Sequence, residues 1–140
     1  MMHHGCWLWM AEPSSLFVRT GRAGSSVAEH AAWRYPSPLP DGPPIKGYLA
    51  FYWHQMDAWY EEVAKVNAPV LAFYGSRDPS VPLEQVRKIQ HMYEEAGKDI
   101  TVKAFDAGHA FLNPDHGMGN EKAAAEAWPL AVNFLKQHLK

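Results

Sequence analysis

Three short apolar runs alternate with amphipathic stretches in the second half of the chain. The runs cover residues 47–53, 69–74 and 100–105, and the first of them is almost continuously apolar. A continuous apolar run of this length is typical of a strand that is buried on both faces of a sheet. The order of runs and stretches predicts a β–α–β–α–β–α arrangement. Because crossovers between parallel strands are right-handed, we expect three adjacent parallel strands with helices on both faces.

A helix is predicted after each of these strands. Asp57 can cap the first helix, over roughly 58–66, because its side chain can accept hydrogen bonds from the free amides of the first turn. Pro82 suits the first turn of the second helix, where its missing amide costs nothing. The last helix covers roughly 121–138. Pro129 inside it should kink or restart the helix, since proline removes a donor and clashes with the preceding turn.

The first part of the chain has a different pattern. Residues 16–18 are compatible with a short strand and residues 26–35 with a short helix. Residues 36–44 contain five prolines in nine positions, a composition typical of an extended linker or arm. We therefore divide the chain into a divergent N-terminal arm with a proline-rich linker (1–44) and an α/β region (45–140).

The composition narrows the class of protein. With 140 residues, of which 47% are hydrophobic, the chain is expected to be a folded globule of one domain. A net charge of −2 gives no reason to expect nucleic acid or an anionic membrane as a partner. The single cysteine, Cys6, excludes an intramolecular disulfide. The apolar N-terminal run is too short to span a bilayer and lacks the basic region of a secretory signal, so we expect a cytoplasmic protein. The histidines show no metal-ligand spacing, and we expect neither a metal nor a cofactor.

Two side chains at predicted strand ends have the chemistry of a catalytic pair. Asp78 follows the second strand in the phrase GSRDPSVP, and His109 follows the third in the phrase GHAF. A carboxylate that orients an imidazole, and an imidazole that takes a proton, are two of the three members of a nucleophile–His–acid triad. The alternatives are ordinary: an Asp-Pro pair often shapes a turn, and a single His is often a structural residue.

The third member, the nucleophile, has no clear place in the sequence. In the chain order of α/β-hydrolases the nucleophile precedes the acid, on a sharp turn of the form G-x-nucleophile-x-G. No such turn is present before Asp78. Cys6 precedes the acid and the base, but it has one flanking glycine, and Trp7 and Trp9 would crowd such a turn. A free thiol in an apolar segment is the favoured interpretation of Cys6, with a nucleophile as the alternative.

Several segments together indicate a known family. From about residue 45 onward the chain is similar to the C-terminal part of the dienelactone hydrolase family, α/β-hydrolases whose nucleophile is usually Cys. The resemblance implies a partial α/β-hydrolase fold, with Asp78 as the triad acid and His109 as the base. Asn113 stands near the position where dienelactone hydrolases place an arginine that holds a substrate carboxylate. The segments that show the resemblance are KGYLAFYW (46–53), PVLAFYGSRDPSVP (69–82), Ala96-Gly97, GHAF with Asn113, and residues 123–139.

The resemblance also points to an incomplete sheet. In an intact hydrolase, the strand that leads into the nucleophile turn pairs with the outer side of the strand predicted here at 47–53. Without that strand, an apolar edge would be open, and such edges are usually covered or paired. We expect either that residues 1–44 fold over this edge or that two chains close it in a homodimer, and we favour the homodimer.

Two functions from different classes follow. The first is an enzyme that hydrolyses small esters or lactones through His109 and Asp78, with Cys6 or a residue of a partner chain as the nucleophile. The second is a non-catalytic, dimeric remnant of the α/β-hydrolase fold, or a binding module that keeps both residues by inheritance. The missing nucleophile turn favours the second function, and the family resemblance favours the first.

Overall fold

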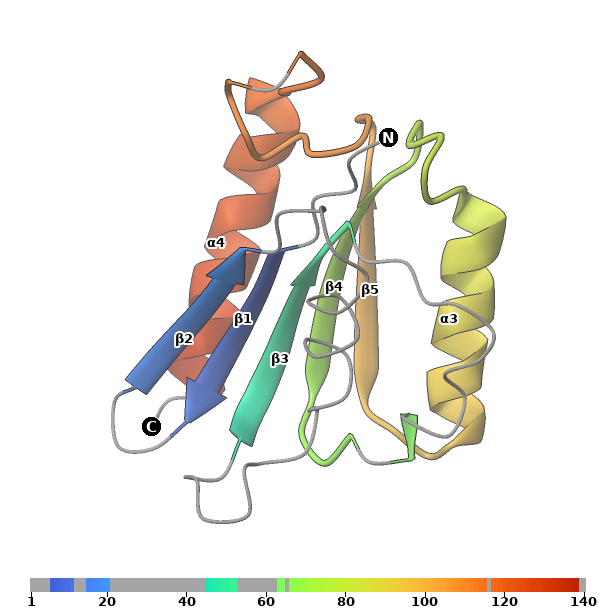
Figure 1. Ribbon diagram of the computed structural model, residues 1–140, viewed down its shortest axis with the longest axis vertical. Helices are drawn as coiled ribbons and strands as arrows, with labels where there is room; N and C mark the ends of the chain where they lie inside the picture. The colour runs from blue at the N-terminus through green and yellow to red at the C-terminus, as the bar shows by residue number, and fades with distance from the viewer. Residues whose placement is uncertain are drawn as a thin grey trace.

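The structure is a computed structural model, and its backbone forms one mixed sheet with a helix on either side (Figure 1). It describes residues 6–11, 15–20, 45–52, 63–64, 66–115 and 117–138, the first two ranges by their backbone alone. The five strands lie in the order β2-β1-β3-β4-β5. Their bounds are Cys6–Ala11 (β1), Ser15–Thr20 (β2), Ile45–Phe51 (β3), Val70–Gly75 (β4) and Ile100–Phe105 (β5). The helices with assigned bounds are Leu83–Glu95 (α3) and Glu121–His138 (α4).

The second half of the sheet has the predicted topology. β3 pairs in parallel with β4, and β4 pairs in parallel with β5. The three predicted parallel strands and the second and last helices are therefore confirmed. The predicted helix over 58–66 falls mostly outside the described residues, and the predicted helix over 26–35 falls entirely outside them.

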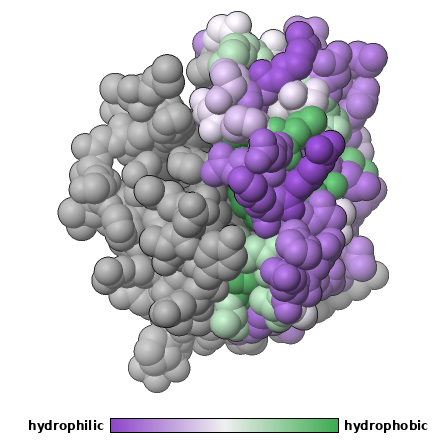
Figure 2. All heavy atoms as spheres, turned by 90° about the vertical axis from the view of Figure 1, so that its right-hand side faces the viewer, coloured by the Kyte–Doolittle hydropathy of each residue, from purple (hydrophilic) through white to green (hydrophobic). Residues whose placement is uncertain are grey.

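Among the described residues, the side chains of α3 pack on one face of the parallel strands and those of α4 on the other. Alternation along β4 divides its side chains: Leu71 and Phe73 lie in the cluster with α4, while Ala72 and Tyr74 lie in the cluster with α3. All six residues of β4 are buried, as expected for a central strand that is covered on both faces. The outer face of α3 carries charged side chains and is largely hydrophilic in the view of Figure 2.

The outer edge of β3 is covered by residues of the chain's own N-terminal region. β1 pairs antiparallel with β3, from Cys6 opposite Phe51 to Ala11 opposite Ile45, and with β2 on its other side. The first of the two expected arrangements, an N-terminal segment over this edge, is the one in the structure. The strand expected at 16–18 is confirmed as β2, whereas β1 was not predicted. The homodimer stays a prediction, and an open edge on β3 no longer supports it.

Helix α4 lies against the sheet through small residues. Ala123, Ala127 and Ala131 follow one another at one-turn spacing and are buried, which lets the helix come close to the strands. The helix continues through Pro129, so the expected restart at this residue is wrong. Among the described helices, none has both the length and the apolar character that a membrane crossing needs.

The alanine stripe generates a prediction about packing. Ala127 is fully buried and Ala125 is exposed on the same helix. Ala127→Leu should lower the free energy of unfolding by about 1–3 kcal/mol, because the larger side chain must push α4 away from the sheet. Ala125→Leu, the matched control, should change it by less than about 0.5 kcal/mol. Urea denaturation of both variants measures this difference, and equal effects would contradict the packing described here.

Candidate active site

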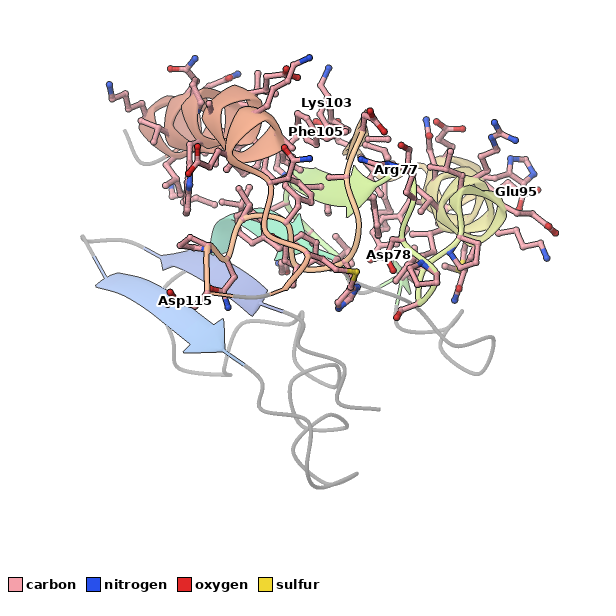
Figure 3. The ribbon with its side chains drawn as sticks, turned by 90° about the horizontal axis from the view of Figure 1, so that it is seen from above. Arg77, Asp78, Glu95, Lys103, Phe105 and Asp115 are labelled. Atoms are coloured by element: carbon pink, nitrogen blue, oxygen red, sulfur yellow. The ribbon has the colours of Figure 1, made fainter. Side chains whose placement is uncertain are left out.

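The candidate site lies at the edge of the sheet where β3, β4 and β5 end. Parallel strands bring their carboxyl ends to the same edge, so the loops that follow β4 and β5 lie side by side. The first loop carries Asp78 and the second carries His109. Figure 3 looks down onto this edge, with Arg77 and Asp78 between α3 and the loop that follows β5.

A close approach at Gly75 joins the two loops. A Cβ atom at this residue would lie 2.3 Å from the carbonyl oxygen of Ala107 and 2.5 Å from that of Gly108, distances that real Cβ atoms do not show. Directly after Gly75, the amide of Ser76 donates to the carbonyl of Phe105 at 2.7 Å, and the amide of Arg77 donates to that of Ala107 at 3.0 Å. The backbones of the two loops are therefore in contact, and this contact sets the position of both candidate side chains.

Asp78 is a buried carboxylate, and both of its oxygens form hydrogen bonds. It is 4% exposed, and its Oδ1 accepts hydrogen bonds from the amides of Ser80 at 2.7 Å and Val81 at 3.1 Å. Its Oδ2 lies 2.7 Å from Nδ1 of His109. Burial raises the pKa of Asp78, but the hydrogen bond and charge of His109 and the two amides outweigh it, so the pKa is below its ordinary value. The carboxylate is thus held in its charged form.

His109 is held through its ring nitrogen Nδ1 by the carboxylate of Asp78. The imidazole is 6% exposed, and its Nδ1–H donates to Asp78. This bond selects the tautomer in which a proton from a nucleophile would be taken by the other ring nitrogen, Nε2. The two side chains that the sequence singled out are therefore hydrogen-bonded to each other, and their roles as acid and base stay a prediction.

Asp106, an exposed carboxylate near the Asp78–His109 pair, is bound to Arg77 and not to His109. Asp106 accepts from Nε of Arg77 at 2.8 Å, and both side chains are largely solvent-exposed. The Arg77 guanidinium also donates to the backbone carbonyl of Asp106 at 3.1 Å. This surface contact ties the start of one loop to the start of the other. Asp78 is the carboxylate that holds His109.

Cys6 lies at the same edge of the sheet by strand direction. β1 is antiparallel to β3, so its first residue is level with the last residue of β3, and the register places Cys6 opposite Phe51 (Figure 1). The side chain of Cys6 is outside the described part of the structure. The backbone thus brings the three candidate residues of the sequence to one edge, and side-chain geometry is described for Asp78 and His109.

Two residues of this site were not singled out in the sequence. Gly75 is adjacent to the predicted acid, but its steric role depends on a contact with a loop about 30 residues away in sequence. Tyr52 follows β3, and its ring centroid lies 5.4 Å from that of His109. A turn glycine and an aromatic residue after a strand are both common, so neither had a distinctive signal. Within the described residues, no group of three His, Cys, Asp or Glu side chains forms a potential metal site.

Gly75 generates the first prediction for the site. Gly75→Ala should lower the free energy of unfolding by about 1–3 kcal/mol, since the added methyl must push two backbone carbonyls aside. It should also weaken the Asp78–His109 hydrogen bond, seen by NMR as faster exchange of the His109 Nδ1–H. Gly117→Ala is the matched control, because a Cβ there meets nothing within 4 Å. Identical behaviour of the two variants would show that the loops do not touch at Gly75.

Asp78 generates a second prediction, on the pH dependence of stability. Because its pKa is lower in the folded chain than its ordinary value of 3.8, the unfolded chain binds the proton at higher pH. The stabilisation is therefore complete above about pH 5 and is lost as the pH falls through the folded-state pKa. Asp78→Asn should lower the free energy of unfolding at pH 7 by about 1–3 kcal/mol. This difference from the unsubstituted chain should shrink steadily between about pH 5 and pH 2.

Denaturant titrations at several pH values measure this effect. Asp115→Asn, at an exposed carboxylate, is the control and should follow the unsubstituted chain. A difference between Asp78→Asn and the unsubstituted chain that stays constant from pH 7 to pH 2 would contradict the linkage.

Solved structures with the same fold provide one comparison. A crystal structure named as a dienelactone hydrolase, from Klebsiella pneumoniae, superimposes with a TM-score of 0.56 at 22% sequence identity. The superposition covers 64% of this chain and 41% of that one. At this level of identity the likeness shows the shared fold, a partial α/β-hydrolase sheet.

Sequence comparisons extend the likeness to the family. A protein of Aquifex aeolicus that carries the name carboxymethylenebutenolidase is 32% identical over 119 residues, which are 84% of this chain and 48% of that protein. A protein of Escherichia coli K12 with the same name is 35% identical over 75 residues, 52% of this chain and 27% of its own length. The chain thus spans about half the length of these relatives, or less. The model of the dienelactone hydrolase family matches residues 38–139, including both Asp78 and His109. The chain belongs to the dienelactone hydrolase family.

Proposed function

We propose that this protein hydrolyses small carboxylic esters or lactones by nucleophile–His–acid chemistry. One observation supports the proposal above the others: the buried 2.7 Å hydrogen bond between His109 Nδ1 and Asp78 Oδ2 at the edge of the sheet. A carboxylate held in its charged form and bonded to Nδ1 keeps the imidazole in the tautomer that general-base catalysis requires. Membership of the dienelactone hydrolase family supports the same class of reaction.

The pair would act in two steps. Nε2 of His109 takes the proton of a thiol or hydroxyl, whose sulfur or oxygen attacks the carbonyl carbon of the ester. The imidazolium, stabilised by Asp78, then returns this proton to the departing alkoxide, and an acyl-enzyme remains. In the second step a water molecule takes the place of the nucleophile. His109 takes a proton from the water, whose oxygen attacks the acyl carbon, and the nucleophile leaves as His109 returns the proton to it. Asp78 stays ionised throughout.

Cys6 is the nucleophile that we propose from within this chain. It starts β1 opposite Phe51, so its backbone lies at the edge where β4 and β5 deliver Asp78 and His109. The start of an antiparallel strand and the end of a parallel strand meet the same edge of a sheet, so this topology can bring a nucleophile to that edge without a strand-to-helix turn. A thiol is also the usual nucleophile of the family. A nucleophile from a second copy of the chain, in a homodimer, is the alternative source.

The loop after His109 favours an uncharged substrate. Asn113 stands near the place where dienelactone hydrolases hold a substrate carboxylate with arginine. Its Oδ1 accepts a hydrogen bond from the amide of Asp115 at 3.0 Å, so the side chain shapes its own turn. An amide group also offers no charge to an anion. We therefore propose a neutral ester or lactone over an anionic lactone.

A second function is favoured by one feature of the sequence. No G-x-nucleophile-x-G turn precedes Asp78. Such a turn also supplies the backbone amide that stabilises the oxyanion of the tetrahedral intermediate. A family member that lacks both would keep the scaffold and the His–Asp pair as a non-catalytic binding module.

Hydrolysis of a small activated ester such as p-nitrophenyl acetate tests the first function. The unsubstituted protein should exceed the buffer rate, and His109→Asn and Cys6→Ala should each lower kcat by about 10³-fold or more. Asp78→Asn should lower kcat by about 10²–10⁴-fold, because it permits the wrong tautomer. His91→Asn is the matched control, since His91 is an exposed histidine that pairs with Glu95 on α3.

The variants separate the possible sources of turnover. A loss in His109→Asn without a loss in Cys6→Ala would reject Cys6 and leave the pair in use with another nucleophile. A rate equal to buffer, or a rate that His109→Asn and His91→Asn change equally, would reject the enzymatic proposal and favour the non-catalytic function.

A further inference from the structure

We propose that Tyr52 is a positioning residue for His109, one that fixes the plane of the imidazole from the end of the neighbouring strand. The inference deepens the proposed function, on which its kinetic consequence rests, while its geometric content stands on the contacts of Tyr52. Three independent observations at this residue support it: the backbone conformation, the ring contacts and the hydroxyl contact.

The backbone of Tyr52 adopts an unusual conformation. Its φ is +55°, in the left-handed region that aromatic residues rarely enter. The amide of Tyr52 nevertheless continues the sheet pairing by donating to the carbonyl of Phe73 at 2.9 Å. A left-handed residue directly after a strand redirects the side chain away from the alternation of that strand. Of the described non-glycine residues, the second with positive φ is Ala110, at +57°, the residue after His109. Backbone strain at functional sites is a recurring feature of enzymes, and both strained residues here adjoin the same imidazole.

The redirected ring packs beside His109. The centroids of the Tyr52 and His109 rings are 5.4 Å apart with an interplanar angle of 51°. On another side, Tyr52 meets Phe111 edge to face at 5.2 Å and 78°. Aromatic pairs at these separations have preferred orientations, so the contacts restrict rotation of the imidazole. Tyr52 is 6% exposed, so the ring that packs beside His109 is part of the packed interior.

The hydroxyl of Tyr52 holds the backbone of the loop that carries His109. It accepts a hydrogen bond from the amide of Leu112 at 2.7 Å. Two further bonds brace the same loop: the amide of Asn113 donates to the carbonyl of Ala110 at 3.0 Å, and the amide of Asn120 donates to that of Phe111 at 3.0 Å. Tyr52 is thus in contact with both the ring of His109 and the main chain three residues later. Asp78 fixes the imidazole through Nδ1, and Tyr52 fixes its plane and its loop.

The conservative variant Tyr52→Phe tests the inference without removing the ring. It deletes the acceptor for Leu112, and the loop and imidazole should become more mobile. With p-nitrophenyl acetate, kcat should fall by about fivefold, the factor for one ordinary hydrogen bond, while KM stays unchanged. In NMR spectra the His109 Nδ1–H should exchange faster with water, and the Leu112 amide should lose protection. Tyr74→Phe is the matched control, because Tyr74 is a fully buried tyrosine of β4 in the cluster on the other face of the sheet.

The two readouts distinguish this inference from the proposed function. A fall in kcat and faster exchange in Tyr52→Phe, with neither in Tyr74→Phe, supports the positioning role. Equal changes in both variants, in step with their loss of stability, would overturn it and make Tyr52 a structural residue. Where the unsubstituted protein shows no turnover, the proposed function fails and the NMR exchange alone decides. Faster exchange of the His109 Nδ1–H then supports the role of Tyr52, and unchanged exchange rejects it.

Discussion

The geometry of the site depends on one steric constraint, the contact between two backbones at Gly75. Because no Cβ fits between Gly75 and the carbonyls of Ala107 and Gly108, the ends of β4 and β5 can run on in contact beyond the last pair of the sheet. The amides of Ser76 and Arg77 extend the pairing along the two loops. The two loops therefore bring Asp78 and His109, which are 31 positions apart, to a separation of 2.7 Å.

The parallel half of the fold and the His–Asp pair were predictable from the sequence because local patterns specify them. A short apolar run such as 69–74 is compatible with burial on both faces, and helical spacing after Pro82 implies a crossover. Once three strands are parallel, their carboxyl ends must share an edge. The polar residues that follow the second and third strands, Asp78 and His109, must then be neighbours. The topology thus places two separate motifs at one candidate site.

The rest was not predictable because it depends on contacts between distant segments. The apolar stretch that begins at Cys6 carries no periodic pattern of its own, and its pairing with β3 is determined by the unsatisfied edge of that strand. The role of Gly75 appears only when residue 107 is placed against it. The positive φ of Tyr52 has no sequence signature, since aromatic residues are common after strands. Pro129 was expected to kink or restart α4, but the helix does not restart there, and the alanine stripe packs against the sheet on both sides of it.

The direction of β1 is the feature that bears most on the chemistry proposed for this chain. An α/β-hydrolase delivers its nucleophile at the end of a parallel strand, through a sharp turn into a helix. An antiparallel strand beside β3 brings its first residue to the same edge. Here that residue is Cys6, which pairs with Phe51, the residue directly before Tyr52. Such a strand pairs with the apolar outer side of β3 and also brings a thiol to the end of the sheet where Asp78 and His109 lie. It supplies no helix start there, and hence no oxyanion amide of the usual kind. If Cys6 is the nucleophile, the oxyanion must be stabilised by donors from another segment. Catalysis by this chain would then be limited by the oxyanion site, while the His–Asp pair is already complete.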